Sequence, residues 1–293
     1  MEANMKKTGQ FFFIFVPFVL TTSLQYLSMI FLMGISALVD SGYSYMQGSH
    51  NAYAIYNDLG AFWTTTRFNT AIMLVYALIN LSVFAIWYYV KYDGCYLVKP
   101  KTLFHPLSLI GILMLVPGLQ FLSNYIVTFT AALFPHWLEV YEDLLETAGL
   151  DDTLTVTMVL YSIILGPISE ELIFRGVTLR QAEKCLPFWL ANFLQALLFG
   201  IFHMNMIQGI YAFCLGLFFG YICKKGGSIY HSILLHMLFN FWGTVISQFL
   251  YYENTSFSFV FWFLFAIVMT GAGMLVFTVG ANQLKHASQV HTA

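Results

Sequence analysis

Residues 153–183 of the chain read TLTVTMVLYSIILGPISEELIFRGVTLRQAE, and this stretch decides the fold class. No charged residue occurs from Thr153 to Ser169. Because about 20 mostly apolar residues suffice for a helix to cross about 30 Å of hydrocarbon, the stretch predicts a membrane-spanning helix. Its second half carries Glu170, Glu171 and Arg175, and ionisable groups inside a span are costly and usually mark a site or a structural pair.

The composition of the whole chain also indicates a membrane environment. Of its 293 residues, 59% are apolar and only 9% are charged, whereas a soluble domain has about 25% charged residues. The lipid bilayer is therefore the expected surrounding. The chain has only 12 Lys and Arg residues and a formal net charge of −2, which excludes nucleic acid as a partner because that affinity rests on clustered cations.

Charge-poor runs long enough to span a bilayer recur along the chain. We predict about eight, with approximate limits 11–35, 69–90, 107–135, 153–183, 187–207, 208–223, 229–250 and 257–282. The chain is thus predicted to be an all-α polytopic membrane protein with an intramembrane polar cavity, and residues 1–293 to form a single membrane domain. In the sixth run, Gly216 and Gly220 form a GxxxG pattern, which predicts close packing against another helix of the same protein.

The positions of the cations predict how these spans are oriented, because Lys and Arg collect in cytoplasmic loops. With eight spans and the N-terminus inside, only Arg67 falls on the outer side. The cations on or near the cytoplasmic face are Lys6, Lys7, Lys91, Lys99, Lys101, Arg175, Arg180, Lys184, Lys224, Lys225 and Lys285. We therefore predict a multi-pass plasma-membrane protein with both termini in the cytoplasm.

The outer loop at residues 136–152 is acidic. It contains Glu139, Glu142, Asp143, Glu146, Asp151 and Asp152 among leucines and a tryptophan. Their spacing permits a short amphipathic helix on the membrane surface, but a solvated loop is the favoured interpretation.

The two adjacent carboxylates are predicted to differ in role. Residues four apart share a helix face, so Glu171 can pair with Arg175, and this pair is interpreted as structural. Glu170 is turned about 100° away from Glu171 and has no cation on its own face. It must therefore find a partner on another helix or contact water.

Depth in the membrane groups Glu170 with polar residues of two other spans. Glu170 and His203 each lie about 16 residues, or about 25 Å, from the predicted turn near Pro187. His236 and Asn240, one helical turn apart, lie about 16 and about 22 Å from the following turn at residues 224–227. These four side chains can converge on one pocket.

Such a pocket has the groups needed to hydrolyse an amide. A carboxylate and an imidazole around one water form a general base, and a second imidazole with a carboxamide can stabilise an oxyanion. No GxSxG motif occurs, and no Cys lies near these histidines, so a covalent nucleophile is not indicated. We predict no cofactor, although zinc held by Glu170, His203 and His236 remains an alternative.

At these residues the sequence resembles the CPBP family of CAAX proteases and bacteriocin-processing enzymes, which includes the type II CAAX prenyl proteases or Ras-converting enzymes. Glu170-Glu171-x-x-x-Arg175 matches its EExxxR motif, Phe199-x-x-x-His203 its FxxxH motif, and His236-x-x-x-Asn240 its HxxxN motif. The matched window, residues 155–245, is the predicted catalytic core. Residues Gly226–Ile229 favour a bacterial member, which weakens the case for a prenylated substrate.

The resemblance implies an intramembrane glutamate-dependent endopeptidase acting on a membrane-associated peptide or protein. Glu170 and His203 would activate water, and His236 and Asn240 would stabilise the oxyanion. Glu171, Arg175 and Phe199 would support the site, with Phe199 packed beneath His203. Two other classes stay open. The first is a non-catalytic bacteriocin-immunity or scaffold protein that uses the same pocket, and the second is a proton-coupled transporter, which is disfavoured because no internal repeats are visible. The oligomeric state is not predicted.

Overall fold

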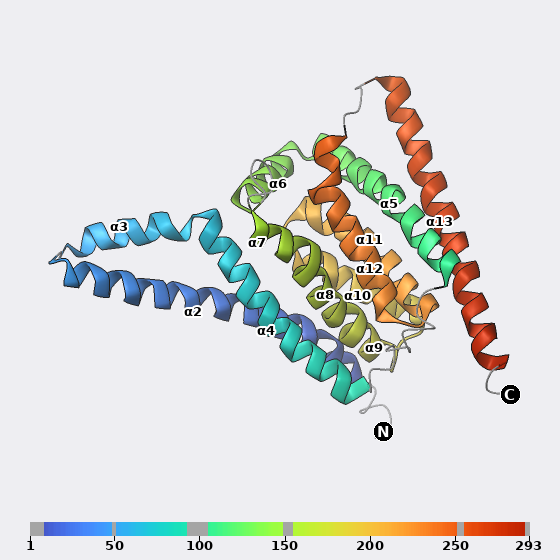
Figure 1. Cartoon of the computed structure of the whole chain (residues 1–293), viewed down its shortest axis with the longest axis horizontal. Helices are drawn as coiled ribbons and strands as arrows, with labels where there is room; N and C mark the ends of the chain where they lie inside the picture. Colours follow the sequence, from blue (N-terminus) through green and yellow to red (C-terminus); the bar gives the residue numbers. More distant parts are fainter. Residues whose placement is uncertain (1–8, 49–50, 93–104, 149–154, 251–254, 291–293) are drawn as a thin grey trace.

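The computed structural model describes residues 9–48, 51–92, 105–148, 155–250 and 255–290, and none of these residues lies in a strand. The predicted all-α fold is confirmed. Helices α8 to α12 form the centre of the molecule, with α4 on one side and α5 and α13 on the other, while α2 and α3 project from the bundle as an arm (Figure 1).

The helices follow one another with few irregular connections. Those of the N-terminal half are η1 (Phe13–Phe15), α2 (Val16–Met46), α3 (Ala52–Trp63), α4 (Thr66–Tyr92), α5 (Pro106–Leu133) and α6 (Pro135–Ala148). Those of the C-terminal half are α7 (Val156–Val159), η3 (Leu160–Leu165), α8 (Gly166–Glu171), η4 (Leu172–Thr178), α9 (Leu179–Ala182), α10 (Phe188–Phe202), α11 (Met206–Gly226), α12 (Ile229–Thr244), η5 (Ile246–Phe249) and α13 (Ser256–Val290).

Seven helical segments of the described chain are long and apolar enough to cross a membrane: Gly9–Met46, Thr66–Tyr92, Pro106–Leu133, Val156–Ala182, Met206–Gly226, Ile229–Phe249 and Ser256–Leu284. The remaining predicted span, residues 187–207, is the shorter apolar helix α10. It is shorter because the chain turns at its end, where Met204 adopts a left-handed backbone conformation with a φ of 53°. A full span therefore does not fit between Pro187 and this turn.

The segment Val156–Ala182 is one continuous helix with two π-helical stretches, η3 and η4. Pro167, at the start of α8, has no N–H to donate and its ring clashes with the carbonyl four residues earlier. The wider η3 turn precedes this proline, and at its end Gly166 N–H donates to Tyr161 O. π-Helical turns occur often at functional sites, and here the two stretches flank Glu170 and Glu171.

Glycines allow the closest helix contacts. A Cβ on Gly216 would lie 2.9 Å from the Cβ of Ala196 on α10, so α11 packs tightly against α10 through the predicted GxxxG face. The prediction that this pattern serves packing inside the protein is confirmed. Helices α5 and α13 approach as closely, since a Cβ on Gly111 would lie 2.5 Å from the backbone nitrogen of Phe277.

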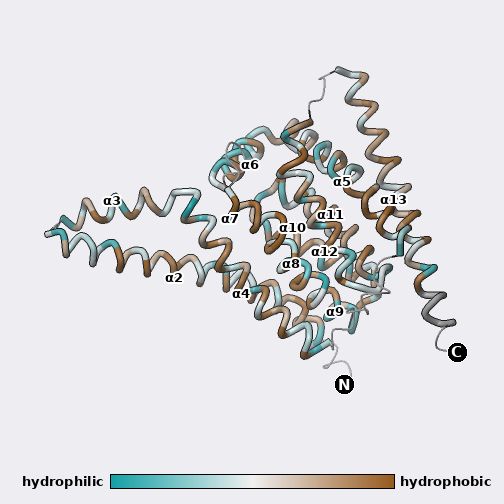
Figure 2. Tube along the Cα trace, in the orientation of Figure 1, coloured by the Kyte–Doolittle hydropathy of each residue, from teal (hydrophilic) through white to brown (hydrophobic). Residues whose placement is uncertain are grey.

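Helix α6 replaces the solvated loop favoured for residues 136–152, and that prediction was wrong over the described part, Pro135–Ala148. The reason is amphipathicity, since Tyr141, Leu144 and Leu145 lie on one face and are partly buried. The acidic residues Glu139, Glu142, Asp143 and Glu146 are exposed. Figure 2 shows this helix as more hydrophilic than the spans beside it. Asp151 and Asp152 lie outside the described residues.

Candidate active site

The turn between α10 and α11 places the first histidine. His203 caps the C-terminal end of α10, and Asn205 begins α11 by accepting a hydrogen bond from the backbone N–H of Gln208 at 3.0 Å. Such a cap satisfies an otherwise unpaired helix donor. The left-handed residue between them, Met204, reverses the chain direction. His203 is therefore held at a fixed point between two packed helices.

The ring of His203 has a defined tautomer. Its Nδ1 lies 2.8 Å from the carbonyl oxygen of Phe199. Because a carbonyl oxygen only accepts, Nδ1 carries the proton and Nε2 keeps its lone pair in the neutral ring. The ring of Phe199 packs edge-on against His203, with centroids 4.8 Å apart. The prediction that Phe199 packs against His203 is confirmed.

Glu171 and Arg175 form the predicted pair. Nη1 of Arg175 donates to Oε1 of Glu171 at 2.8 Å, and both side chains are fully buried. The guanidinium carbon also lies 4.4 Å from the centroid of Phe199. Arg175, counted by sequence with the cytoplasmic cations, is thus an interior residue. Removing one partner of a buried pair leaves an uncompensated charge, so this contact is structurally important.

His236 lies between the two glutamates. Its Nδ1 is 3.0 Å from Oε1 of Glu171, and its Nε2 is 3.7 Å from Oε2 of Glu170. Nδ1–H donates this hydrogen bond to the Glu171 carboxylate, and Nε2 is directed at Glu170. Sequence reasoning gave Glu170 no partner on its own helix face, and the structure supplies one from α12.

Asn240 lies one turn after His236. Its Nδ2 donates to the carbonyl oxygen of Ser162 at 2.7 Å. This bond ties α12 to the π-helical stretch η3 and uses one of the two amide protons. The second proton remains for a ligand.

All four predicted catalytic residues, Glu170, His203, His236 and Asn240, line one cavity of about 530 Å³ together with Phe199. Glu171 and Arg175 lie behind it. The side chain of Glu170 is 15% exposed, whereas that of Glu171 is 0% exposed. Of the two carboxylates, Glu170 is therefore the one that a substrate can reach.

Sequence reasoning missed much of the cavity wall. Further polar side chains also line it: Gln25, Tyr76, Gln120, Ser123, Asn124, Tyr141, Tyr161, Ser162, Gln208, Tyr211, Thr244 and Ser247. Tyr76 is held by Thr21 of α2, with the two hydroxyl oxygens 3.0 Å apart. Gln120 and Asn124 had a usable signal, since two carboxamides four residues apart in an apolar span share one face.

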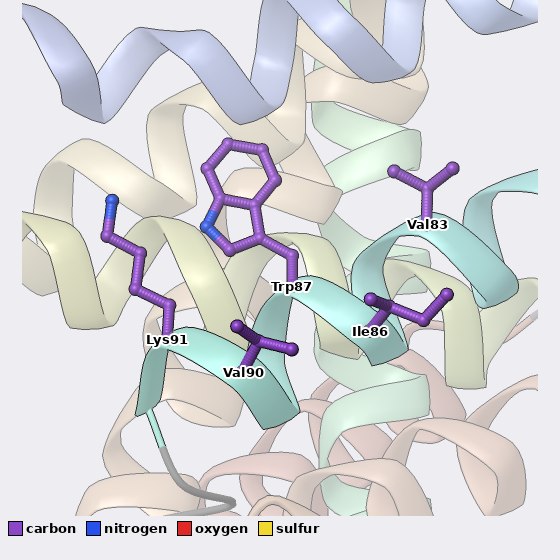
Figure 3. A pocket seen from close by; sticks show the side chains of 5 residues that line it. All are labelled: Val83, Ile86, Trp87, Val90 and Lys91. Atoms are coloured by element: carbon purple, nitrogen blue, oxygen red, sulfur yellow. The ribbon is translucent and has the colours of Figure 1, made fainter.

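A second hollow has a different character. It lies along α4 and is lined by Val83, Ile86, Trp87, Val90 and Lys91 (Figure 3). None of these side chains can act as a general base at neutral pH, because the Lys91 ammonium is a donor only. The hydrolytic groups therefore belong to the first cavity.

The metal-free site and the zinc alternative both stay predictions. In the part of the chain that the structure describes, no group of three or more His, Cys, Asp or Glu side chains could hold a metal ion. His203 directs Nδ1 to a carbonyl oxygen, and the closest carboxylate of His236 is that of Glu171.

Residues 152–242 match the family model described as type II CAAX prenyl endopeptidase Rce1-like. The match includes all three motifs and confirms the resemblance to the CAAX protease family. No curated protein and no solved structure matches the chain. That residues 1–293 form one membrane domain with a core at 155–245 stays a prediction.

Proposed function

We propose that this chain, whose residues 152–242 form an Rce1-like domain of the CAAX protease family, is an intramembrane glutamate-dependent endopeptidase. Its substrate is a peptide bond in a membrane-associated peptide or protein. One observation carries the proposal: Glu170, His203, His236 and Asn240 come from three helical segments and line the same cavity.

The general base would be shared by Glu170 and His203. Nε2 of His203 is free to accept a proton because Nδ1–H is bound to Phe199 O. A water between this nitrogen and the Glu170 carboxylate would lose a proton as its oxygen attacks the carbonyl carbon of the substrate. The proton is then delivered to the departing amine as the C–N bond breaks, which leaves a carboxylate and a free amine.

The developing oxyanion would be stabilised by His236 and Asn240. Asn240 keeps its second amide proton, and His236 donates from Nε2 as the imidazolium, because their other donor positions bind Ser162 and Glu171. Preorganised donors of this kind are worth about 2.7–4 kcal/mol each in acyl-transfer enzymes. The contact between His236 and Glu171 fixes the orientation of the ring.

Seven apolar helical segments make this a polytopic membrane protein. We place it in the plasma membrane with both termini in the cytoplasm, on the distribution of its Lys and Arg residues. This placement requires α10 to cross as a shorter, eighth helix.

The experiment compares Glu170→Ala and His203→Ala with the unaltered protein in two assays. One follows cleavage of a mixed peptide library by the purified protein, with products identified by mass spectrometry. The other tests whether each protein restores the normal phenotype to cells that lack the gene. If the protein is an endopeptidase, each variant loses peptide cleavage and the cellular phenotype. An immunity or scaffold protein keeps its phenotype without the carboxylate, and that outcome would overturn the proposal.

A further inference from the structure

The cations of the bundle gather at one end, apart from Arg67 at the start of α4. Lys91, Arg180, Lys184, Lys224 and Lys225 lie where α4, α9 and α11 end. These ends adjoin one another, because Lys224 and Arg180 both pair with Glu183, and Nζ of Lys184 lies 4.8 Å from the ring centroid of Tyr92. One end of the bundle is therefore cationic.

The opposite end is acidic. Helix α6 carries four exposed carboxylates there, Glu139, Glu142, Asp143 and Glu146. Figure 1 shows α6 far from α9 and from both chain termini. No Lys or Arg occurs between residues 102 and 174 or between residues 226 and 284, so the connections after α5 and α12 add no cation. By the positive-inside rule, the acidic end faces away from the cytoplasm.

The catalytic cavity belongs to the acidic half. Helix α6 itself contributes Tyr141, Leu144 and Leu145 to its wall. The other helices line it with residues near their α6-facing ends, among them Met73 in the first part of α4 and Val127 in the last part of α5. The lining continues past the end of α12 to Ser247, which is exposed.

We propose that the cavity opens on the non-cytoplasmic side, so that the protein acts on a peptide segment without negative charge that lies on the outer face of the membrane. The claim that the protein cleaves this segment rests on the proposed peptidase function, whereas the side on which the cavity opens is independent of that function.

The lining of the cavity indicates why the segment carries no negative charge. Carboxamides and hydroxyls such as Gln120, Asn124 and Gln208 line it, and these groups can donate to and accept from a peptide backbone. None of the described residues that line it is Lys or Arg. A free C-terminal carboxylate would therefore enter without a cation to offset its desolvation, which favours an internal stretch of chain over the extreme C-terminus.

Cysteine labelling tests on which side of the membrane the cavity opens. In a background with Cys95, Cys185, Cys214 and Cys223 replaced by Ala, Ser247→Cys reports the cavity mouth. Glu142→Cys and Lys225→Cys report the acidic and cationic ends. In intact bacterial cells a membrane-impermeant maleimide should label Ser247→Cys and Glu142→Cys, with Lys225→Cys labelled only after permeabilisation. Labelling of Lys225→Cys alone in intact cells would overturn the proposal. If the cysteine-free protein fails to accumulate, the native background gives the same comparison after subtraction of its own signal.

Sealed membrane vesicles test on which side of the membrane the protein cleaves peptides. Right-side-out vesicles should cleave an added library of uncharged, water-soluble peptides at internal bonds, and inverted vesicles should do so only after detergent. Cleavage by sealed inverted vesicles alone, or only within three residues of a free C-terminus, would contradict the inference. Absence of cleavage in every preparation, detergent included, would contradict the peptidase function, while the labelling result would still decide the side.

Discussion

At the scale of single residues, the adjacent carboxylates Glu170 and Glu171 have different surroundings and so different expected defects. We predict that Glu170→Gln abolishes cleavage and leaves the fold intact, because it removes only the base at the cavity wall. Glu171→Gln should lower thermal stability, because Arg175 loses its buried counter-charge. Breaking a buried pair costs about 3–5 kcal/mol. Cleavage rate and thermal unfolding in detergent measure the two effects.

Each glutamate variant is the control for the other, since both replace a carboxylate by its isosteric amide on one helix. A Glu171→Gln protein that unfolded normally but was inactive, together with an active Glu170→Gln protein, would reverse the assignment of roles.

His203 allows a similarly sharp substitution. In His203→Asn the side-chain amide takes the place of Nδ1 and can still donate to Phe199 O, while the group at Nε2 is lost. We predict a fall in cleavage rate of about 10²–10⁴, typical of a lost general base, with unchanged thermal unfolding. Retained activity in this variant would show that Nε2 takes no part in the chemistry.

At the scale of elements, close helix contacts depend on a few glycines. Gly111→Ala would bring a Cβ within 2.5 Å of backbone atoms of Phe277, and a backbone cannot move aside as a flexible side chain can. We predict a loss of stability of about 1–3 kcal/mol, the usual cost of overpacking, visible as earlier thermal unfolding.

The matched control is Gly271→Ala on α13, where an added Cβ meets nothing within 4 Å. There Ala should be neutral or favourable, since Gly costs a helix interior up to about 1 kcal/mol relative to Ala. Equal destabilisation by both substitutions would mean that α5 and α13 do not pack as described.

At the scale of the whole molecule, the arrangement of donors supports catalysis without a metal. His236 and Asn240 can supply the hydrogen bonds that a Lewis acid would otherwise provide. We predict that purified active protein keeps its cleavage rate after treatment with a chelator and contains less than one zinc per chain by elemental analysis. Stoichiometric zinc, with activity lost on its removal and restored on its return, would overturn this prediction and make Glu170, His203 and His236 ligands.

The helical membrane fold and the motif residues could be predicted from sequence because both are local properties. Hydropathy over about 20 residues marks a span, and the spacing of four residues places Glu171 beside Arg175 on any helix. Counting residues from the turns placed Glu170 and His203 at one depth and His236 and Asn240 at comparable depths. For the same reason α10 was predicted too long, since the turn at Met204 lies within an apolar run.

Only the tertiary structure decided which faces meet. Three features of the site depend on how far each helix is rotated and shifted against its neighbours. His236 lies between Glu170 and Glu171, Asn240 binds Ser162, and α6 covers the cavity. Rotation and shift are set by side-chain packing between segments distant in sequence, such as Gly216 against Ala196. A periodic pattern within one helix identifies its polar face and leaves open which helix that face contacts.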